Sequence, residues 1–179
     1  MADERTEPSA SSAPAGDIDV PPTVVATTTI AVNRRLGRGG IGDVYTASDR
    51  ATGRSLAVKF LNDWALEQAS CREAFDFEAT VTSQLEHPNI VPVYVTGATP
   101  DGKPFYAMRL IPGRTLAAAI AEFHDRRHAG ESAERRSARY NELLGQFVLA
   151  CKAIAYAHDR GVIHRDIKPA NIMLGKFGE

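Results

Sequence analysis

The sequence has few of the features that mark secreted, membrane or nucleic-acid-binding proteins. Its two cysteines are too few and too far apart to predict a disulfide framework or a metal knuckle. No apolar run approaches the roughly 18 residues that a membrane-spanning helix needs. The chain starts with two acidic residues among its first four, which is unlike a signal peptide. Twenty-one basic and 22 acidic residues give a net charge of −1, which favours neither nucleic acid nor anionic lipid. We therefore expect a cytoplasmic chain without a nucleic-acid partner or a membrane segment.

Large apolar side chains are almost absent from residues 1–28, which are rich in Ala, Ser, Thr, Pro and Asp. Such a segment cannot bury enough surface to offset the entropy lost on ordering the chain. We expect residues 1–28 to form a disordered tail. A docking or phosphorylation role for this tail is the alternative to an inert leader.

The most informative stretch covers residues 162–174. Apolar runs at both of its ends predict buried strands, so the polar residues between them form a loop. Pro169 keeps the preceding residue out of the helical region and excludes a helix through the middle. Such a loop can present Asp166, Lys168 and Asn171 to one cavity. A carboxylate that takes or orients a hydroxyl proton, a cation that neutralises phosphate and an amide that binds magnesium together suit phosphoryl transfer.

These residues carry a resemblance to a known family. The pattern His164-Arg165-Asp166-x-Lys168-x-x-Asn171 resembles the catalytic loop of protein kinases, and lysine two places after aspartate is similar to the Ser/Thr branch. The resemblance implies Asp166 as catalytic base and Lys168 as the group that steadies the transferring γ-phosphate. It implies Asn171 as a magnesium ligand, with His164 and Arg165 as scaffolding.

A glycine-rich segment precedes this loop by more than a hundred residues. Gly37, Gly39, Gly42 and Val44 form a Gly-x-Gly-x-x-Gly-x-Val pattern, which alone is weak because dinucleotide-binding proteins share the spacing. A dinucleotide fold requires a helix directly after the glycines, whereas the residues that follow have the pattern of two strands around a turn. Glycines between antiparallel strands make a flap whose backbone can lie close to phosphates.

An ion pair is predicted between Lys59 and Glu78. Alternation along the strand 55–61 places Lys59 on the same face as Ala57, where an amine among apolar neighbours needs an anion. The alternative is an edge-strand lysine that reaches solvent. A helix is predicted over about residues 71–85, with one inward stripe of four residues: Ala74, Glu78, Val81 and Leu85. The resemblance implies that this pair holds the amine on the α- and β-phosphates.

The resemblance also implies a site for adenine. Residues 105–111 are predicted to form the last strand of the small lobe, with Met108 behind the adenine and the backbone of residues 109–111 as the hinge. Arg109 departs from the acidic residue common at its position, which alters only the rim because the hinge binds through backbone groups. The predicted nucleotide-binding residues are Leu36, Gly37, Gly39, Gly42, Val44, Ala57, Lys59, Glu78, Met108, Arg109 and Ile111.

Two helices are predicted between this hinge and the catalytic loop. Thr115 is expected to cap a helix that runs to about Phe123. Residues 124–139 carry mixed charges and are interpreted as a solvated connection, with a docking surface as the alternative. Residues 140–158 are predicted to form an amphipathic helix packed under the catalytic loop, with one apolar stripe: Leu143, Phe147, Ala150 and Ile154.

The implied fold is α+β and protein-kinase-like. A five-stranded antiparallel N-lobe sheet with helix C is expected over residues 29–113, and the first part of a mainly helical C-lobe over residues 114–179. A complete kinase domain needs roughly 250 residues, and the Asp-Phe-Gly-like motif would fall about five residues after Glu179. We therefore expect a fragment, inactive alone, of a kinase similar to the eukaryotic-like Ser/Thr protein kinases of bacteria, which uses ATP and Mg²⁺ on protein substrates. The alternative is a non-catalytic nucleotide-binding or scaffold module.

Overall fold

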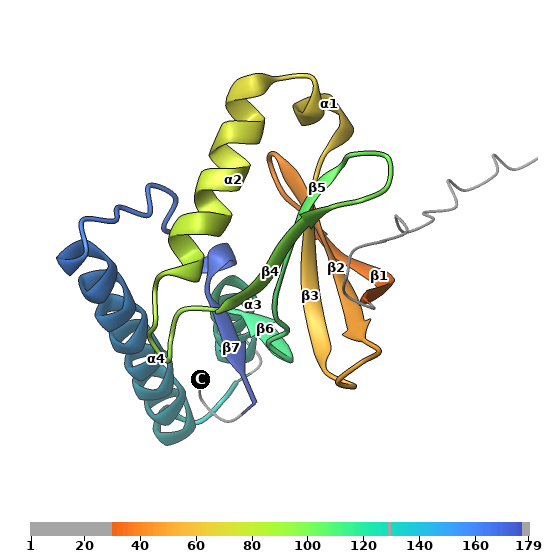
Figure 1. The fold of residues 1–179 in the computed structure, drawn as a ribbon. Helices are drawn as coiled ribbons and strands as arrows, with labels where there is room; N and C mark the ends of the chain where they lie inside the picture. The colour runs from red at the N-terminus through yellow and green to blue at the C-terminus, as the bar shows by residue number, and fades with distance from the viewer. Residues whose placement is uncertain (1–29, 129, 177–179) are drawn as a thin grey trace, which may run out of the picture.

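The structure, a computed structural model, describes residues 30–128 and 130–176. Five strands form one sheet (Figure 1): β1 (Ile30–Arg38), β2 (Gly42–Asp49), β3 (Ser55–Leu61), β4 (Val93–Ala98) and β5 (Pro104–Arg109). Their order across the sheet is β1-β2-β3-β5-β4, and every neighbouring pair is antiparallel. The predicted five-stranded antiparallel sheet is confirmed. The predicted tail over residues 1–28 lies outside the described residues.

Alternation along the strands divides the apolar side chains between the two faces of the sheet. One face carries eight buried residues: Ile30, Tyr45, Ala47, Leu56, Val58, Phe60, Phe105 and Ala107. The other face packs against helices α1 (Asp63–Leu66) and α2 (Ala69–Ser83) through five buried residues: Leu61, Ala65, Phe75, Ala79 and Tyr106. Lys59 points to this second face, as the alternation predicted, so its side chain lies between the sheet and α2.

The buried face of helix α2 is offset by one residue from the predicted inward stripe. Phe75 and Ala79 are its two fully buried residues, whereas Ala74 is exposed. The ring of Phe75 packs against that of Tyr106, with 5.1 Å between the centroids. Burying an aromatic ring removes far more apolar surface from water than burying an alanine, which explains the rotation of the helix. Glu78 consequently lies at the edge of the buried face, with 43% of its side chain exposed.

Two helices make up most of the other half of the molecule, α3 (Leu116–His128) and α4 (Ala133–Asp159). Figure 1 shows α4 on the side of the molecule that faces away from β1. Thr115 caps α3 as predicted, because its Oγ1 accepts a hydrogen bond from the Ala118 N–H at 3.1 Å. Within the described part of the chain, no helix is both long and apolar enough to cross a membrane.

The charged stretch over residues 124–139 is mostly exposed, as expected of a solvated connection, but most of it is helical, so the predicted helix boundaries on both sides are wrong. Helix α3 continues to His128, and α4 already begins at Ala133. Ser132 caps α4 by accepting a hydrogen bond from the Arg135 N–H at 3.4 Å. The Ala, Glu and Arg residues that follow this cap have high helix propensity, which outweighs their polarity as an indication of a loop.

Only part of the apolar stripe predicted along α4 is buried. Three of its residues are half-buried: Leu143, Ala150 and Ile154. Phe147 is 52% exposed and, with Leu143, lines a hollow of about 300 Å³ between α3 and α4. The fully buried positions of α4 are Ala153 and Ala157. A pattern of large apolar residues does not identify these positions, because alanine occurs on both faces of a helix.

The stretch over residues 162–174 has a strand at one end only. Strand β7 (Met173–Gly175) begins at its C-terminal end, but residues 162–163 are not in a strand and Ile163 is 66% exposed. The prediction of a buried strand before the loop is wrong, because two or three apolar residues are too few to define one. Lys168 is extended, with φ −153°, directly before the short 3₁₀ helix η1 (Pro169–Asn171). This backbone agrees with the predicted effect of Pro169.

A second, two-stranded sheet joins the segment after β5 to the end of this loop. Strand β6 (Gly113–Thr115) pairs with β7 in antiparallel fashion, and Gly113 is the register partner of Gly175. A Cβ atom at Gly113 would overlap the carbonyl group of Leu174, so this close approach of two backbones requires glycine. The predicted lobe boundary after residue 113 therefore falls within β6.

Tyr156 of α4 joins the two halves of the molecule. Its hydroxyl accepts a hydrogen bond from the Glu86 N–H at 3.1 Å, directly after α2. Its ring lies 5.1 Å from that of His87, measured between centroids, and 3.7 Å from the Arg160 guanidinium carbon. The segment between α2 and β4 is thereby held against the helical half of the molecule.

Candidate active site

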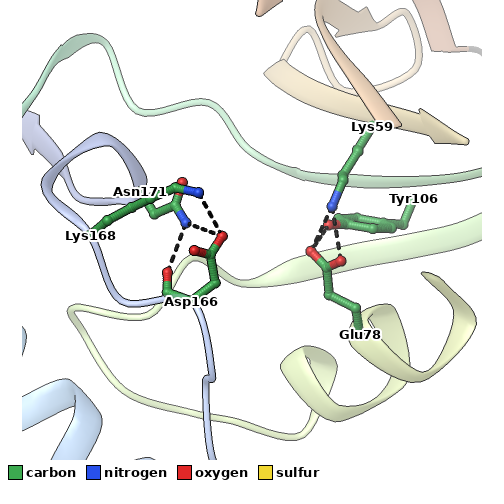
Figure 2. A network of polar contacts seen from close by, with 6 residues as sticks. All are labelled: Lys59, Glu78, Tyr106, Asp166, Lys168 and Asn171. Atoms are coloured by element: carbon green, nitrogen blue, oxygen red, sulfur yellow. Dashed lines mark hydrogen bonds and ion pairs between the residues drawn. The ribbon is translucent and has the colours of Figure 1, made fainter. Parts of the chain in front are cut away.

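The side chains of Lys59 and Glu78 meet between the sheet and α2 (Figure 2). Lys59 Nζ lies 2.8 Å from Glu78 Oε1 and 2.9 Å from Glu78 Oε2. The predicted pair is therefore present, although its members are 19 residues apart in the sequence. Only 16% of the Lys59 side chain is exposed, which excludes the alternative of a lysine that reaches into solvent. A cation with so little water around it needs a carboxylate partner, and the contact with both oxygens fixes the position of the amine.

Tyr106 is a third member of this cluster, and no sequence pattern identified it. Its hydroxyl donates to Glu78 Oε1 at 2.7 Å (Figure 2), and the residue is 4% exposed. Burial, and then the neighbouring Glu78 carboxylate, raise the pKa of Tyr106 above its usual value, so that the hydroxyl stays protonated and donates. Tyr106 is the register partner of Lys59 in the β3–β5 ladder. The pairing of β3 with β5 would identify Tyr106 as a neighbour of Lys59, but the sequence does not reveal this register.

The predicted glycine flap is the turn between β1 and β2. The Gly39 N–H donates to the Gly42 carbonyl at 2.9 Å and closes the turn. A Cβ atom at Gly42 would lie 2.6 Å from the Phe60 carbonyl oxygen and 3.1 Å from Lys59 Cε, so only glycine fits there. The aliphatic part of Lys59 thus runs directly beneath the turn, and Val44 is its register partner in β2.

Asn62, at the end of β3, supports the glycine turn from below. Its side-chain Nδ2 lies 3.4 Å from the carbonyl oxygens of both Gly39 and Gly40. This contact holds two carbonyl groups toward Asn62, and no sequence pattern predicted it. Leu36 and Gly37, at the end of β1, are exposed. They form the outer rim of the segment.

The residues predicted to surround adenine lie on neighbouring strands. Ala57 is buried and is the register partner of Met108, which is half-buried. Arg109 is exposed, and its Nε lies 3.4 Å from the Tyr94 hydroxyl. The Arg109 N–H donates to the Pro92 carbonyl at 3.2 Å. Ile111 lies beyond β5, and no backbone hydrogen bond occupies its N–H within the described residues.

Asp166, Lys168 and Asn171 form a second cluster around η1 (Figure 2). Lys168 Nζ lies 2.9 Å from Asp166 Oδ2, and Asn171 Nδ2 donates to the same oxygen at 3.0 Å. A further bond of 2.9 Å, from Asn171 Nδ2 to the Asp166 carbonyl oxygen, closes the loop on itself. The three residues predicted to share one cavity are thus brought together by mutual contacts.

The hydrogen bonds from Lys168, and then from Asn171, hold the pKa of Asp166 below its usual value. An aspartate with its usual pKa is already ionised at neutral pH, so the main effect of these two hydrogen bonds is to fix the position of a carboxylate that can accept or orient a proton. Arg165, directly before it, has φ +63°, the left-handed conformation that a residue with a side chain adopts at some cost. The His164 Nδ1 accepts a hydrogen bond from the Asp166 N–H at 3.2 Å and helps to hold this turn.

Figure 2 shows the two clusters in one view, Lys59 on β3 and Asp166 on the loop before η1. Within the described residues, no hydrogen bond or ion pair joins them. One cluster presents a largely buried ammonium beneath a turn whose Gly39 and Gly40 are exposed, and the other presents an ionised carboxylate beside a second ammonium. This arrangement suits a polyanion at the first cluster and acceptance of a proton at the second.

The donor groups also fit a magnesium-bound nucleotide. In the described part of the chain, no group of three or more His, Cys, Asp or Glu side chains is placed to hold a metal ion by itself. Mg²⁺ at nucleotide sites commonly takes one or two protein ligands and completes its shell with phosphate oxygens and water. Asn171 turns its Nδ2 toward Asp166, so its Oδ1 remains available as such a ligand.

Known proteins share this sequence pattern. A family model described as the protein kinase domain matches residues 30–179. The chain is 37% identical over 146 residues to the serine/threonine-protein kinase PknD of Protochlamydia amoebophila. It is 36% identical over 147 residues to the PknD proteins of Chlamydia trachomatis serovar D and Chlamydia pneumoniae. These matches cover 82% of this chain and 15–16% of each relative, so the chain spans only a small part of their length.

Proposed function

This chain belongs to the protein kinase family and to its Ser/Thr lineage, and from this we propose that it supplies the nucleotide grip and the catalytic loop of an ATP-dependent protein Ser/Thr kinase. Kinases of this family generally transfer the γ-phosphoryl group of ATP with the help of Mg²⁺. The chain spans about 15% of the length of its PknD relatives. The proposal concerns the steps that these residues carry out within such a protein.

The first step is binding of ATP beneath the glycine turn. We assign the adenine to the space beside Ala57 and Met108, with the backbone of residues 109–111 as its hydrogen-bonding edge. The Ile111 N–H supports this assignment, because no described backbone group accepts from it. The exposed glycines at the end of β1 leave the turn backbone accessible to phosphates, and Lys59 supplies the positive charge below them.

The second step is transfer of the phosphoryl group to a hydroxyl of the protein substrate. We assign Asp166 to accept or orient the proton of that hydroxyl, because its carboxylate is ionised at neutral pH and is held in place by Lys168 and Asn171. Lys168 would steady the transferring phosphate, since its ammonium lies beside that carboxylate. Asn171 Oδ1 would hold Mg²⁺, which when bound neutralises the negative charge of the phosphates.

The observation that carries the proposal is the contact between Lys59 and both carboxylate oxygens of Glu78 under the glycine turn. A lysine that only stabilises the fold does not require a glycine packed against it. A turn that only connects two strands does not require a lysine beneath it. Their combination, with Gly42 packed on the Lys59 side chain, is useful where phosphates must reach a positioned amine.

Binding of MgATP to Lys59→Met tests the assignment. We expect this substitution to raise the Kd about 10- to 100-fold, because it removes a hydrogen bond to a charged phosphate. Isothermal titration calorimetry on the purified chain measures the change. Asp166→Asn should leave the Kd near that of the unmodified chain, since this side chain acts on the acceptor hydroxyl rather than on the nucleotide.

Lys103→Met is the matched control, because Lys103 also pairs with a carboxylate, Asp63, at 2.7 Å, but outside the glycine turn. Its Kd should change less than twofold. An equal loss of affinity in Lys59→Met and Lys103→Met, or no loss in either, would contradict the role of Lys59. In a longer chain that contains these residues, nucleotide binding without phosphoryl transfer would favour the non-catalytic scaffold alternative.

A further inference from the structure

The geometry points to a positioning role for Tyr106, and this inference rests on the proposed function. We propose that the Tyr106 hydroxyl ties Glu78 to the sheet and so holds α2 in the arrangement in which Lys59 is paired before any nucleotide binds. Tyr106 would thus act on the nucleotide through Glu78 and Lys59, without touching it.

The hydrogen bonds of Glu78 show how such a tie works. Glu78 Oε1 accepts from both Lys59 Nζ, at 2.8 Å, and the Tyr106 hydroxyl, at 2.7 Å, whereas Oε2 accepts from Lys59 alone. Lys59 and Tyr106 project side by side from neighbouring strands of one rigid ladder. Two donors fixed to the sheet therefore hold one carboxylate that belongs to the helix.

The position of α2 makes this tie necessary. Among its residues only Phe75 and Ala79 are fully buried, and the side chain of Glu78 remains 43% exposed at the edge of the helix. A carboxylate in such a place can rotate into water, which would leave Lys59 without its partner. Outward movement of Glu78 would also leave a buried hydroxyl without an acceptor, and that cost opposes the movement.

A purely structural role of the tyrosine is the competing explanation. The opposite face of the same sheet buries Tyr45, whose ring packs edge-on against Phe60 at 5.6 Å between centroids. Tyr45 has no carboxylate partner among the described residues. The sheet thus accommodates a buried tyrosine ring without such a bond, so the contact with Glu78 is a property of the Tyr106 position.

Hydrogen exchange of the amides of α2, over residues 69–83, measures the tie without any nucleotide. Tyr106→Phe keeps the ring and removes the hydroxyl, and we expect exchange in α2 to become about tenfold faster. Tyr45→Phe removes a tyrosine hydroxyl from the other face of the same sheet and should change the α2 rates less than twofold. Unchanged α2 exchange in Tyr106→Phe would overturn the proposal.

Glu78→Ala tests the same bond from its other end, and it serves alone should Tyr106→Phe not fold. Exchange in α2 should become faster in Glu78→Ala, and adding Tyr106→Phe to this background should produce less than a twofold further change. A general packing role would give additive effects instead, and additivity would overturn the tie. This non-additivity separates positioning through Glu78 from burial of the ring.

MgATP binding then separates this proposal from the proposed function. We expect Tyr106→Phe to raise the Kd about three- to tenfold, less than Lys59→Met, because it lowers only the population of the paired arrangement. Weaker binding in Lys59→Met with no change of Kd or α2 exchange in Tyr106→Phe would overturn the tie alone. Faster α2 exchange in Tyr106→Phe in a folded chain that binds no MgATP would contradict the proposed function and support the tie.

Discussion

Asp166 is an exposed carboxylate whose pKa depends on two neighbours in its own loop. Because the bond from Lys168 contributes most to lowering its pKa, Lys168→Met should raise the pKa of Asp166 toward the usual value of an aspartate. Asn171→Ala should raise it by a smaller amount. Carbon-detected NMR of labelled aspartate side chains, followed as the pH is lowered, measures each value.

The direction of the pH effect follows from the same contacts. A carboxylate whose pKa is lowered in the folded state adds stability above its unfolded-state pKa, and this contribution is lost as the pH falls through the folded-state value. Lys152→Met is the matched control, because it removes one positive charge from an exposed position of α4. If the pKa of Asp166 is the same in Lys168→Met as in Lys152→Met, the hydrogen bond from Lys168 is not what lowers it.

At the residue scale, sequence reasoning found the charged groups of the site but overlooked two neutral side chains that support them. Alternation along β3 correctly oriented Lys59, and the need for an anion correctly selected Glu78. Tyr106 was overlooked, because a tyrosine within an apolar strand suggests only a core residue. Asn62 was overlooked because its contact to the glycine turn depends on where β3 ends. Both residues act through neighbours that only the folded chain brings close.

At the scale of elements, the β6–β7 pair depends on one close approach. Gly113→Ala would place a methyl group onto the carbonyl of Leu174, and neither backbone can retreat without breaking the pairing. We expect the free energy of unfolding to fall by about 1–3 kcal/mol, as for other overpacked sites. Urea denaturation followed by circular dichroism measures this loss.

Gly145→Ala is a control that should raise the free energy of unfolding instead of lowering it. Gly145 lies within α4, and a methyl group added there would meet no atom within 4 Å, while alanine favours helix by about 0.5–1 kcal/mol. The free energy of unfolding should therefore rise in this variant. A loss of similar size in both variants would indicate that the region tolerates no added methyl group, rather than that β6 and β7 require a glycine.

The elements themselves were predictable to different degrees. The five-stranded antiparallel sheet was implied by the family resemblance, and local patterns of apolar and turn residues supported individual strands such as β3. The phase of α2 was wrong by one residue, because Ala74 and Phe75 both fit an apolar stripe and only packing against Tyr106 decides between them. The first turns of α4 were missed, because charge was taken as evidence of a loop when Ser132 was a helix cap.

At the scale of the whole molecule, the described contacts include one that joins the sheet half to the helical half over a long sequence separation. The Glu86 N–H, directly after α2, donates to the Tyr156 hydroxyl of α4 across 70 residues of sequence. No local pattern reveals such a contact, so the sequence predicted both halves but not how they meet. Since Lys59 lies in one half and Asp166 in the other, contacts of this kind affect how the two clusters are placed relative to each other.

Loss of the Tyr156 junction should uncouple the halves during unfolding. Tyr156→Ala removes the hydrogen bond from Glu86, the ring contact with His87 and the contact with Arg160. The single tryptophan, Trp64 in α1, reports on the sheet half by fluorescence, whereas far-ultraviolet circular dichroism is dominated by helices. In the unmodified chain we expect the two signals to give coincident urea transitions.

In Tyr156→Ala the fluorescence and dichroism transitions should separate, because each half would then unfold with its own stability. Tyr140→Ala removes another tyrosine from the same helix, one that is 56% exposed and has no partner in the sheet half among the described residues. Its two transitions should remain coincident. Coincident transitions in Tyr156→Ala as well would show that the contacts of Tyr156 do not couple the unfolding of the two halves.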